Sequence, residues 1–533
     1  MITIQAKKHD SLSVEFKFGF DVGEDDVDVN DFAVNVWLFV PNSMGISSET
    51  YGKEQFYRDI KSNLRLITPV FSMEEMSCGT SLPYTYLKES VASATSGAGG
   101  GELFEYHLKM FAAIFRSALK REAAKFRYIR NPLQFSAMAE ELRANVGATL
   151  DLYRSFREQA GYMSPAEKLR YLAVDEYLGF LVQLYFFRIL KYADSHKVKP
   201  SPQSRDALIG MIRAEEDYAR ESGYASFSSD PVNNRDVVYR HGLLKKYVES
   251  DLYIGLDKKK DGVAVEQLYY SIAAGVAMIF ATGVGWATQV RYGNITLPLF
   301  IVLVISYMMK DRIKDLMRFY FAHRLVNKYY DKKAPIKIGN GKCGELKEGV
   351  DFISGSKIDS EVMRLRSDGA AFSEESGILE EKVLLYRQRC VLDGRAMSSG
   401  KQYPLRGVNE IMRLHLSRFM QKMDNPDVPV DMADGEGNVT TLRVQRIYYI
   451  NVILQLKHRS QEEYRHFRIA MNRNGVIKVE EMPGRAGHDE REAGHDGMFY
   501  DLSSRPSEAS GEICITNWIS IDISTMHFVL RSI

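Results

Sequence analysis

Two short His-Asp motifs near the C-terminus are the residues of this chain whose types could support metal or acid–base chemistry. Ala486-Gly487-His488-Asp489 is followed by Ala493-Gly494-His495-Asp496, so the two pairs lie seven residues apart. Imidazole nitrogens and carboxylate oxygens are ligands for divalent transition metals. The glycines around them are typical of a flexible loop, which does not hold ligands in a fixed geometry. We therefore expect no metal site here and keep an enzyme with an unrecognised site near His488 and His495 as one hypothesis.

Two further stretches contain residue types that bind ions, but their spacing favours a plainer interpretation. The acidic connection 21–31 could offer oxygens to calcium, yet it does not match the spacing of an EF-hand loop and is interpreted as a solvated tip between strands. The glycine-rich stretch 95–102 precedes a helix and could cradle phosphate. Because it lacks the Lys-Ser/Thr pair of a P-loop, we interpret it as a linker. The sequence thus indicates no cofactor and leaves the catalytic residues unknown.

Composition limits the class of protein further. The 533 residues are enough for about three domains. A net charge of +1 gives no global basic field, which makes a nucleic-acid partner unlikely. The four cysteines form no CxxC pair and indicate neither a zinc site nor a disulfide framework, as expected in a reducing cytoplasm: Cys78, Cys343, Cys390 and Cys514.

The strongest signal is a pair of uncharged, mostly apolar runs in the middle of the chain. The first run, Gln267 to Val290, has 24 residues, and the second, Tyr292 to Met309, has 18, with only Arg291 between them. A helix rises about 1.5 Å per residue and a bilayer core is about 30 Å thick, so each run is long enough, or nearly so, to span a membrane. The sequence predicts a transmembrane helical hairpin at 266–310.

Aromatic and basic residues around the hairpin agree with this prediction and indicate its orientation. Aromatic rings favour the membrane interface, where we place Tyr269, Tyr270, Trp286, Tyr292 and Tyr307. Basic flanks remain on the cytoplasmic side, and here they are Lys258, Lys259, Lys260, Lys310, Arg312 and Lys314. We therefore expect an integral membrane protein with two spans and both termini in the cytoplasm, in a bacterial inner membrane.

Small residues recur every four positions along the first membrane helix. Ala273, Ala277, Ala281 and Gly285 form one ridge, and small side chains let helix backbones approach closely in lipid. The ridge packs either on the second helix of the same hairpin, which is the favoured interpretation, or on a neighbouring subunit. Neither helix carries a charge within its apolar run, which argues against a proton relay or an ion site inside the membrane.

Patterns outside the hairpin predict mixed α and β structure. Leu12 to Phe20 and Phe32 to Val40 alternate with period two and predict strands. From about Thr50 the pattern is helical, which gives a small β-rich subdomain with a following helix at 1–95 and a helical bundle at 100–255. A juxtamembrane helix is expected at 311–338.

The C-terminal half predicts an α+β domain at 356–533. Residues 339–355 resemble a linker, and helices are expected around 375–392 and 406–423. An antiparallel meander follows, with a hairpin at Asn474-Gly475 and a last strand near Trp518. The expected fold class is therefore α+β and multidomain, with a central two-helix transmembrane hairpin.

The sequence is compatible with three hypotheses for the function of the protein. The favoured hypothesis is a non-catalytic scaffold or signal-coupling component at a membrane, whose partners are the lipid bilayer and either another protein or further copies of the chain. The second hypothesis is an oligomeric effector whose cytoplasmic domains sense a ligand and whose hairpins perturb the bilayer. An enzyme with a site near His488 and His495 is the third.

Overall fold

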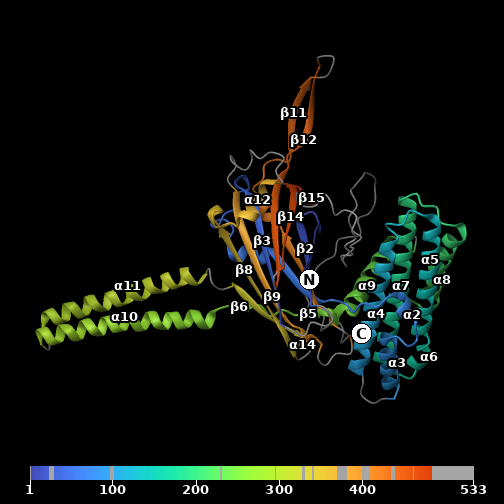
Figure 1. Cartoon of the computed structure of the whole chain (residues 1–533), viewed down its shortest axis with the longest axis horizontal. Helices are drawn as coiled ribbons and strands as arrows, with labels where there is room; N and C mark the ends of the chain where they lie inside the picture. Colours follow the sequence, from blue (N-terminus) through green and yellow to red (C-terminus); the bar gives the residue numbers. More distant parts are fainter. Residues whose placement is uncertain are drawn as a thin grey trace.

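The structure is a computed structural model that describes residues 2–482, apart from 23–28, 97–100, 229–230, 294–295, 327–329, 339–340, 369–380, 399–402, 404, 406, 434–437 and 460. His488, His495 and the strand expected near Trp518 lie outside the described residues, as do most of the acidic connection and the glycines at 97–100. The described chain forms a β-rich body with a helical bundle on one side and a long helical hairpin on the other (Figure 1).

Two antiparallel sheets form the β-rich body. The larger has the strand order β15 (Gly475–Glu481), β14 (Gln461–Asn472), β13 (Tyr448–His458), β3 (Val29–Pro41), β9 (Glu381–Asp393), β8 (Gly341–Ile353), β7 (Lys332–Ile338) and β6 (Lys259–Lys260). The smaller has the order β1 (Ile2–Lys8), β2 (Ser13–Asp21), β10 (Gly407–His415), β4 (Ile60–Leu66) and β5 (Tyr253–Ile254). Apolar side chains from both sheets belong to one core.

The first strands have the alternating apolar residues that the sequence predicts, and the side chains on one face of each strand lie in this core. Phe16 and Phe18 of β2 and Val34 and Val36 of β3 are almost fully buried. Trp37 lies on the other face of β3, where helix α12 (Ser360–Asp368) covers the larger sheet. The central strand β3 is therefore apolar on both faces because both faces are covered.

Strands from the two ends of the chain lie in the same sheets. The sequence pattern predicts them in two separate domains, at 1–95 and 356–533. Strand β2 pairs with β10, and β3 lies between β13 and β9. Period-two alternation predicts that a strand exists but not which strand lies beside it, so this mixing of the two ends has no local signal.

Three segments of the C-terminal half differ from their predicted structures. The helix expected around 375–392 is replaced, over its described part, by β9, and the helix expected around 406–423 is β10 followed by the short helix α15 (Ser417–Met420). The linker expected at 339–355 contains β8. In β9 the buried side chains include Tyr386, Gln388 and Cys390, which is the alternation of a strand.

The helical bundle lies beside the smaller sheet. Ser164 and Glu167 form a capping box at the start of its longest helix, as the sequence predicts. The main helices are α3 (Leu82–Thr95), α4 (Gly101–Lys125), α5 (Pro132–Arg154), α7 (Pro165–Ser195), α8 (Pro202–Glu221) and α9 (Pro231–Glu249), with the short α2 (Met73–Ser77) and α6 (Arg157–Ala160) between them. Helices α1 (Lys53–Asp59) and α14 (Gly394–Ser398) belong to the β-rich body.

The central hairpin consists of α10 (Val263–Tyr292) and α11 (Leu297–Val326), which project together away from the body (Figure 1). The juxtamembrane helix expected at 311–338 is not a separate element. Helix α11 continues through it to Val326, and β7 begins at Lys332. The chain is therefore mixed α+β, with an N-terminal sheet, a helical bundle and C-terminal antiparallel strands, in agreement with the predicted fold class at that level.

Candidate functional site

The α10–α11 hairpin exposes an extended apolar surface. Large side chains along both helices are largely solvent-exposed: Leu268, Ile279, Trp286, Val290, Leu297, Phe300, Ile305 and Met308. A soluble monomer rarely exposes a contiguous apolar patch larger than a few hundred Å². A projecting hairpin that exposes so many large apolar side chains therefore requires a covering partner or lipid.

The four small residues of the first helix lie where the two helices meet. Ala273 and Ala277 are 0% and 1% exposed. The hydroxyl of Ser306 donates to the carbonyl oxygen of Ala281 at 3.2 Å, and a Cβ on Gly285 would lie 3.1 Å from Leu303 Cδ2. Helix α11 of the same chain thus packs against the ridge.

The same contacts fix how the two helices are paired along their length. Gly285 lies opposite Leu303 and Ala281 opposite Ser306, while the Arg318 guanidinium lies 5.1 Å from the centre of the Tyr270 ring. Lys310 and the charged residues after it therefore lie beside the first half of the apolar run of α10. The length over which both helices are uncharged is about 13 residues, or about 20 Å.

This pairing explains a difference between the two helices in their capacity to cross a membrane. Within the described residues, one helix is long and apolar enough to span a bilayer, and it covers Val265–Arg291. Helix α11 begins only at Leu297 and reaches its first charge at Lys310. Four residues of the second apolar run, 293–296, precede the helix, so its uncharged helical part is shorter than the sequence pattern implies.

The aromatic and basic residues expected at the interface lie near the turn, around the middle and at the root of the hairpin. Trp286, near the turn, is 72% exposed, and Tyr307 lies under Lys310, whose ammonium is 3.9 Å from the ring centre. At the root, Tyr270 donates to Glu266, which also pairs with Lys260 at 2.6 Å. The side chain of Tyr292 lies outside the described residues, and Tyr269 is half-buried.

The root of the hairpin is built into the larger sheet. The two-residue strand β6 enters α10 and pairs antiparallel with β7, which follows α11, so that Lys260 lies opposite Lys332. The backbone N–H of Asp261 donates to the carbonyl oxygen of Asp331 at 3.2 Å. The strand that leads into α10 and the strand that follows α11 are therefore paired with each other at the edge of the larger sheet.

Asp331 is the centre of the polar contacts at this root. Its carboxylate accepts from the Lys53 ammonium at 2.8 Å, from the Tyr57 hydroxyl at 3.1 Å and from the Val350 backbone N–H at 2.8 Å. Lys53 also pairs with Asp351 at 2.7 Å. Burial alone would lower the pKa of Lys53, but its hydrogen bonds to the two carboxylates outweigh burial and leave that pKa above its ordinary value.

A second ion pair lies deeper under the same root. The Lys258 ammonium pairs with Glu348, which is 2% exposed, at 2.9 Å, and the Tyr386 hydroxyl donates to the same carboxylate at 3.2 Å. Lys258 directly precedes β6. The buried carboxylate of Glu348 in β8 is therefore neutralised by a residue of the segment that leads into the hairpin. Sequence reasoning missed this network because its members are far apart in the chain and no local pattern marks them.

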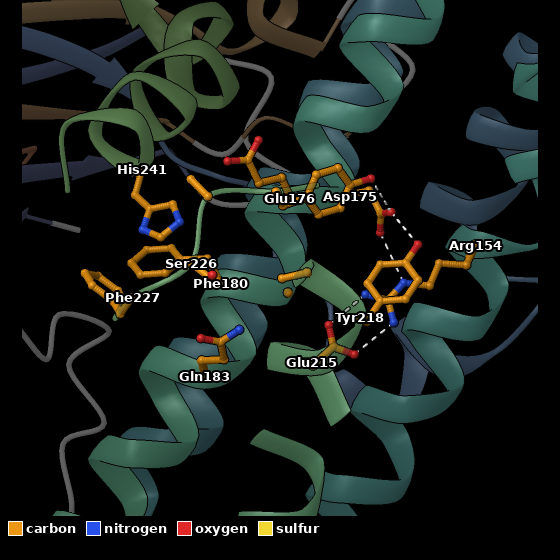
Figure 2. A pocket seen from close by; sticks show the side chains of 14 residues that line it. Arg154, Asp175, Glu176, Phe180, Gln183, Glu215, Tyr218, Ser226, Phe227 and His241 are labelled. Atoms are coloured by element: carbon orange, nitrogen blue, oxygen red, sulfur yellow. Dashed lines mark hydrogen bonds and ion pairs between the residues drawn. The ribbon is translucent and has the colours of Figure 1, made fainter. Parts of the chain in front are cut away.

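The helical bundle contains a separate polar pocket (Figure 2). The Arg154 guanidinium binds both oxygens of Glu215 at 2.8 and 2.7 Å and reaches Asp175 at 3.1 Å. The hydroxyls of Tyr218 and Tyr224 also donate to Asp175, at 2.7 and 2.9 Å. The free space is about 10 Å³, room for about one water molecule, so these groups bind one another and hold α5, α7 and α8 together.

His241 lines the other end of that pocket. Its ring stacks on Phe180, with the ring centres 3.7 Å apart, and meets the edge of Phe227 (Figure 2). Burial, followed by the charge of Arg240, lowers the pKa of His241 to about 4. The imidazole is therefore neutral at physiological pH and packs as an aromatic side chain between α7 and α9.

The described residues contain no group of His, Cys, Asp and Glu side chains that could hold a metal ion. The candidate residues His488 and His495 lie outside the described part of the chain. The candidate functional site is therefore the hairpin together with its root, because the exposed apolar surface of the hairpin must be covered.

A double substitution in the ridge measures how closely α10 and α11 pack. Ala277→Leu with Ala281→Leu inserts bulk where the helices touch, and overpacking of this kind costs about 1–3 kcal/mol. We expect a lower melting temperature in detergent without a specific change in assembly size. Val276→Leu, on the exposed face of the same helix, is the control and should change neither. A stable variant that forms smaller assemblies would instead place the ridge between subunits.

No family model, curated protein or solved structure matches the chain.

Proposed function

We propose that this chain is a membrane-anchored protein whose α10–α11 hairpin inserts into a bilayer and whose two large parts remain in the cytoplasm. It acts as a non-catalytic scaffold or coupling component. The observation that carries this proposal is the hairpin itself: it projects from a well-packed body and exposes large apolar side chains from Leu268 to Met308. Lipid covers such a surface without requiring a specific groove on another protein.

The charge distribution supports an orientation with both termini in the cytoplasm. Lys258, Lys259 and Lys260 precede the hairpin and Lys310, Arg312 and Lys314 follow its apolar part, whereas only Arg291 lies between the two apolar runs. The long stems of the basic residues on α11 allow their charged ends to reach the membrane surface from within the helix. Asp311 lies 3.9 Å from Lys314, which reduces the cost of placing its carboxylate close to lipid.

The way the hairpin is attached supports a coupling role rather than a passive anchor. Between the end of α9 and the start of α10, the chain contributes β5 to the smaller sheet and β6 to the larger sheet. A displacement of the bundle therefore reaches the hairpin through paired strands and not through a flexible linker. The ion pairs of Lys53 with Asp331 and of Lys258 with Glu348 hold this connection in place.

Reporter fusions test the proposed topology. Alkaline phosphatase, which is active only outside the cytoplasm, is fused at the N-terminus, after Asn294 between the two apolar runs, or at the C-terminus. We expect activity only from the fusion after Asn294 and the reverse pattern from a reporter that works only in the cytoplasm. Phosphatase activity at either terminus would overturn the orientation. Recovery of the intact chain in the soluble fraction would overturn the membrane proposal itself.

A further inference from the structure

A second projection leaves the β-rich body at the ribbon formed by β11 (Asp427–Ala433) and β12 (Val439–Gln445). These strands pair only with each other among the described strands, and nearly all of their residues are exposed. The base of the ribbon is held in place, because the Arg446 backbone N–H donates to the Pro426 carbonyl oxygen at 2.7 Å and Tyr448 donates to Asp424 at 3.1 Å. The ribbon therefore projects from a fixed base.

The two faces of the ribbon differ in polarity. Residues directly opposite each other in an antiparallel pair share a face. One face, here called the apolar face, carries the pairs Val428 with Val444, Val430 with Leu442, and Met432 with Thr440. The opposite face carries Asp427, Asp431 and Arg443 among its residues. All the charged side chains of the two strands thus lie on one face, while the other exposes valine, leucine and methionine.

Such a ribbon is not expected to exist alone in water. An isolated two-stranded sheet is marginally stable, and a third strand or a packed face is usually needed. The side chains of Val430, Met432, Leu442 and Val444 are 40%, 51%, 50% and 49% exposed, so the described body does not cover them. A partner that packs on the apolar face would supply the missing burial.

The direction of the ribbon narrows the choice of partner. Figure 1 shows the ribbon and the α10–α11 hairpin leaving the body in crosswise directions. If the hairpin stands across a bilayer, as proposed above, the ribbon extends sideways, along the membrane surface. Every copy in the membrane then holds its ribbon at the same height, where it meets the ribbons of neighbouring copies.

We propose that the apolar face of the β11–β12 ribbon docks on the same face of a second copy of this chain. The inference rests on the proposed membrane anchoring. The face is uncharged, so two copies meet without repulsion between like charges. A two-fold axis through the middle pair, Val430 and Leu442, brings the apolar face of each copy against that of the other, as an isologous dimer contact requires.

The size of the contact explains why the membrane is needed. Seven residues of strand are about 23 Å long, and two strands are about 10 Å wide, so the face covers roughly 230 Å² per copy. Stable interfaces in solution bury about 1,200–2,000 Å² in total. The ribbon contact alone is too small to form a dimer in dilute solution, but confinement of both copies to one membrane raises their effective concentration.

Cysteine cross-linking in membranes tests this contact. Val430→Cys places a thiol near the expected two-fold axis, in a chain whose Cys78 and Cys514 are changed to serine. Val439→Cys, on the opposite face and 74% exposed, is the matched control. We expect mild oxidation to give at least tenfold more covalent dimer from Val430→Cys than from Val439→Cys, both in cell membranes and in liposomes that contain only the purified chain.

The remaining outcomes each contradict a defined part of the inference. Equal dimer yields from the two variants, with the chain in the membrane fraction, would overturn the ribbon contact and leave the membrane proposal intact. A cross-linked product that forms in cell membranes but not in liposomes of the purified chain would identify another protein as the partner and overturn the inference. A chain found in the soluble fraction would overturn the proposed function and this inference with it.

Discussion

Excision of the hairpin is expected to release the protein from the membrane without unfolding it. In the test variant, residues 263–329 are replaced by Asn-Gly, so that Gly262 and Tyr330 flank the new turn. Because Lys260 already lies opposite Lys332 and the Asp261 N–H bonds to Asp331, this change converts β6 and β7 into an ordinary β-hairpin with a four-residue loop. Membrane fractionation with a carbonate wash, followed by circular dichroism, measures both properties.

The excised chain should move almost entirely from the membrane pellet to the supernatant and keep the far-ultraviolet spectrum of a mixed α+β protein. The full-length chain, treated in parallel, should stay in the pellet after the wash. An excised chain that still sediments with membranes would show that another part of the protein binds lipid. An excised chain that is soluble but unfolded would show that the sheet depends on the hairpin.

Removal of the Lys258 charge is expected to cause the largest loss of stability among single substitutions at the root. Lys258→Met leaves the Glu348 carboxylate buried with the Tyr386 hydroxyl but without its cation. Breaking a buried ion pair by removing one partner costs about 3–5 kcal/mol, because the other charge remains out of water. We expect the melting temperature of the protein in detergent to fall by several degrees.

Two further variants separate the ion pair from other effects of this substitution. Lys259→Met changes the adjacent lysine, whose pair with Asp257 is exposed on both sides, and should leave the melting temperature nearly unchanged. Lys258→Met combined with Glu348→Gln removes both charges and should recover most of the lost stability. If the double variant is no more stable than Lys258→Met, the loss comes from the lysine stem and not from an unpaired carboxylate.

The parts of the fold that sequence reasoning predicted correctly depend on local patterns. Strand β2 follows from the alternation that ends at Phe20, and the turn between β14 and β15 lies at Arg473 and Asn474, next to the predicted Asn474-Gly475 signal. The capping box at Ser164 begins the helix that it predicts. In each case the residues that determine the structure are within a few positions of each other.

The parts that were missed depend on contacts between distant residues. The sequence predicts a helix where strand β9 lies, because its apolar residues fit either period and only the pairing with β3 and β8 selects the strand. The root network joins Lys53 to Asp331 and Lys258 to Glu348, pairs that no short window of sequence contains. The sequence pattern overestimates the uncharged helical length of the second span, because the second apolar run includes the residues before Leu297.

If the hairpin spans a bilayer, as proposed above, the pairing of α10 with α11 implies a hydrophobic mismatch. The two helices are uncharged together over about 20 Å, while an average bilayer core is about 30 Å thick. A span that is too short thins the lipid around it, at a cost of a fraction of a kcal/mol for each Å of difference. Copies that share one thinned patch share that cost, so the lipid itself draws hairpins together. In that arrangement, the same difference favours thin membranes over thick ones as the place where the protein accumulates.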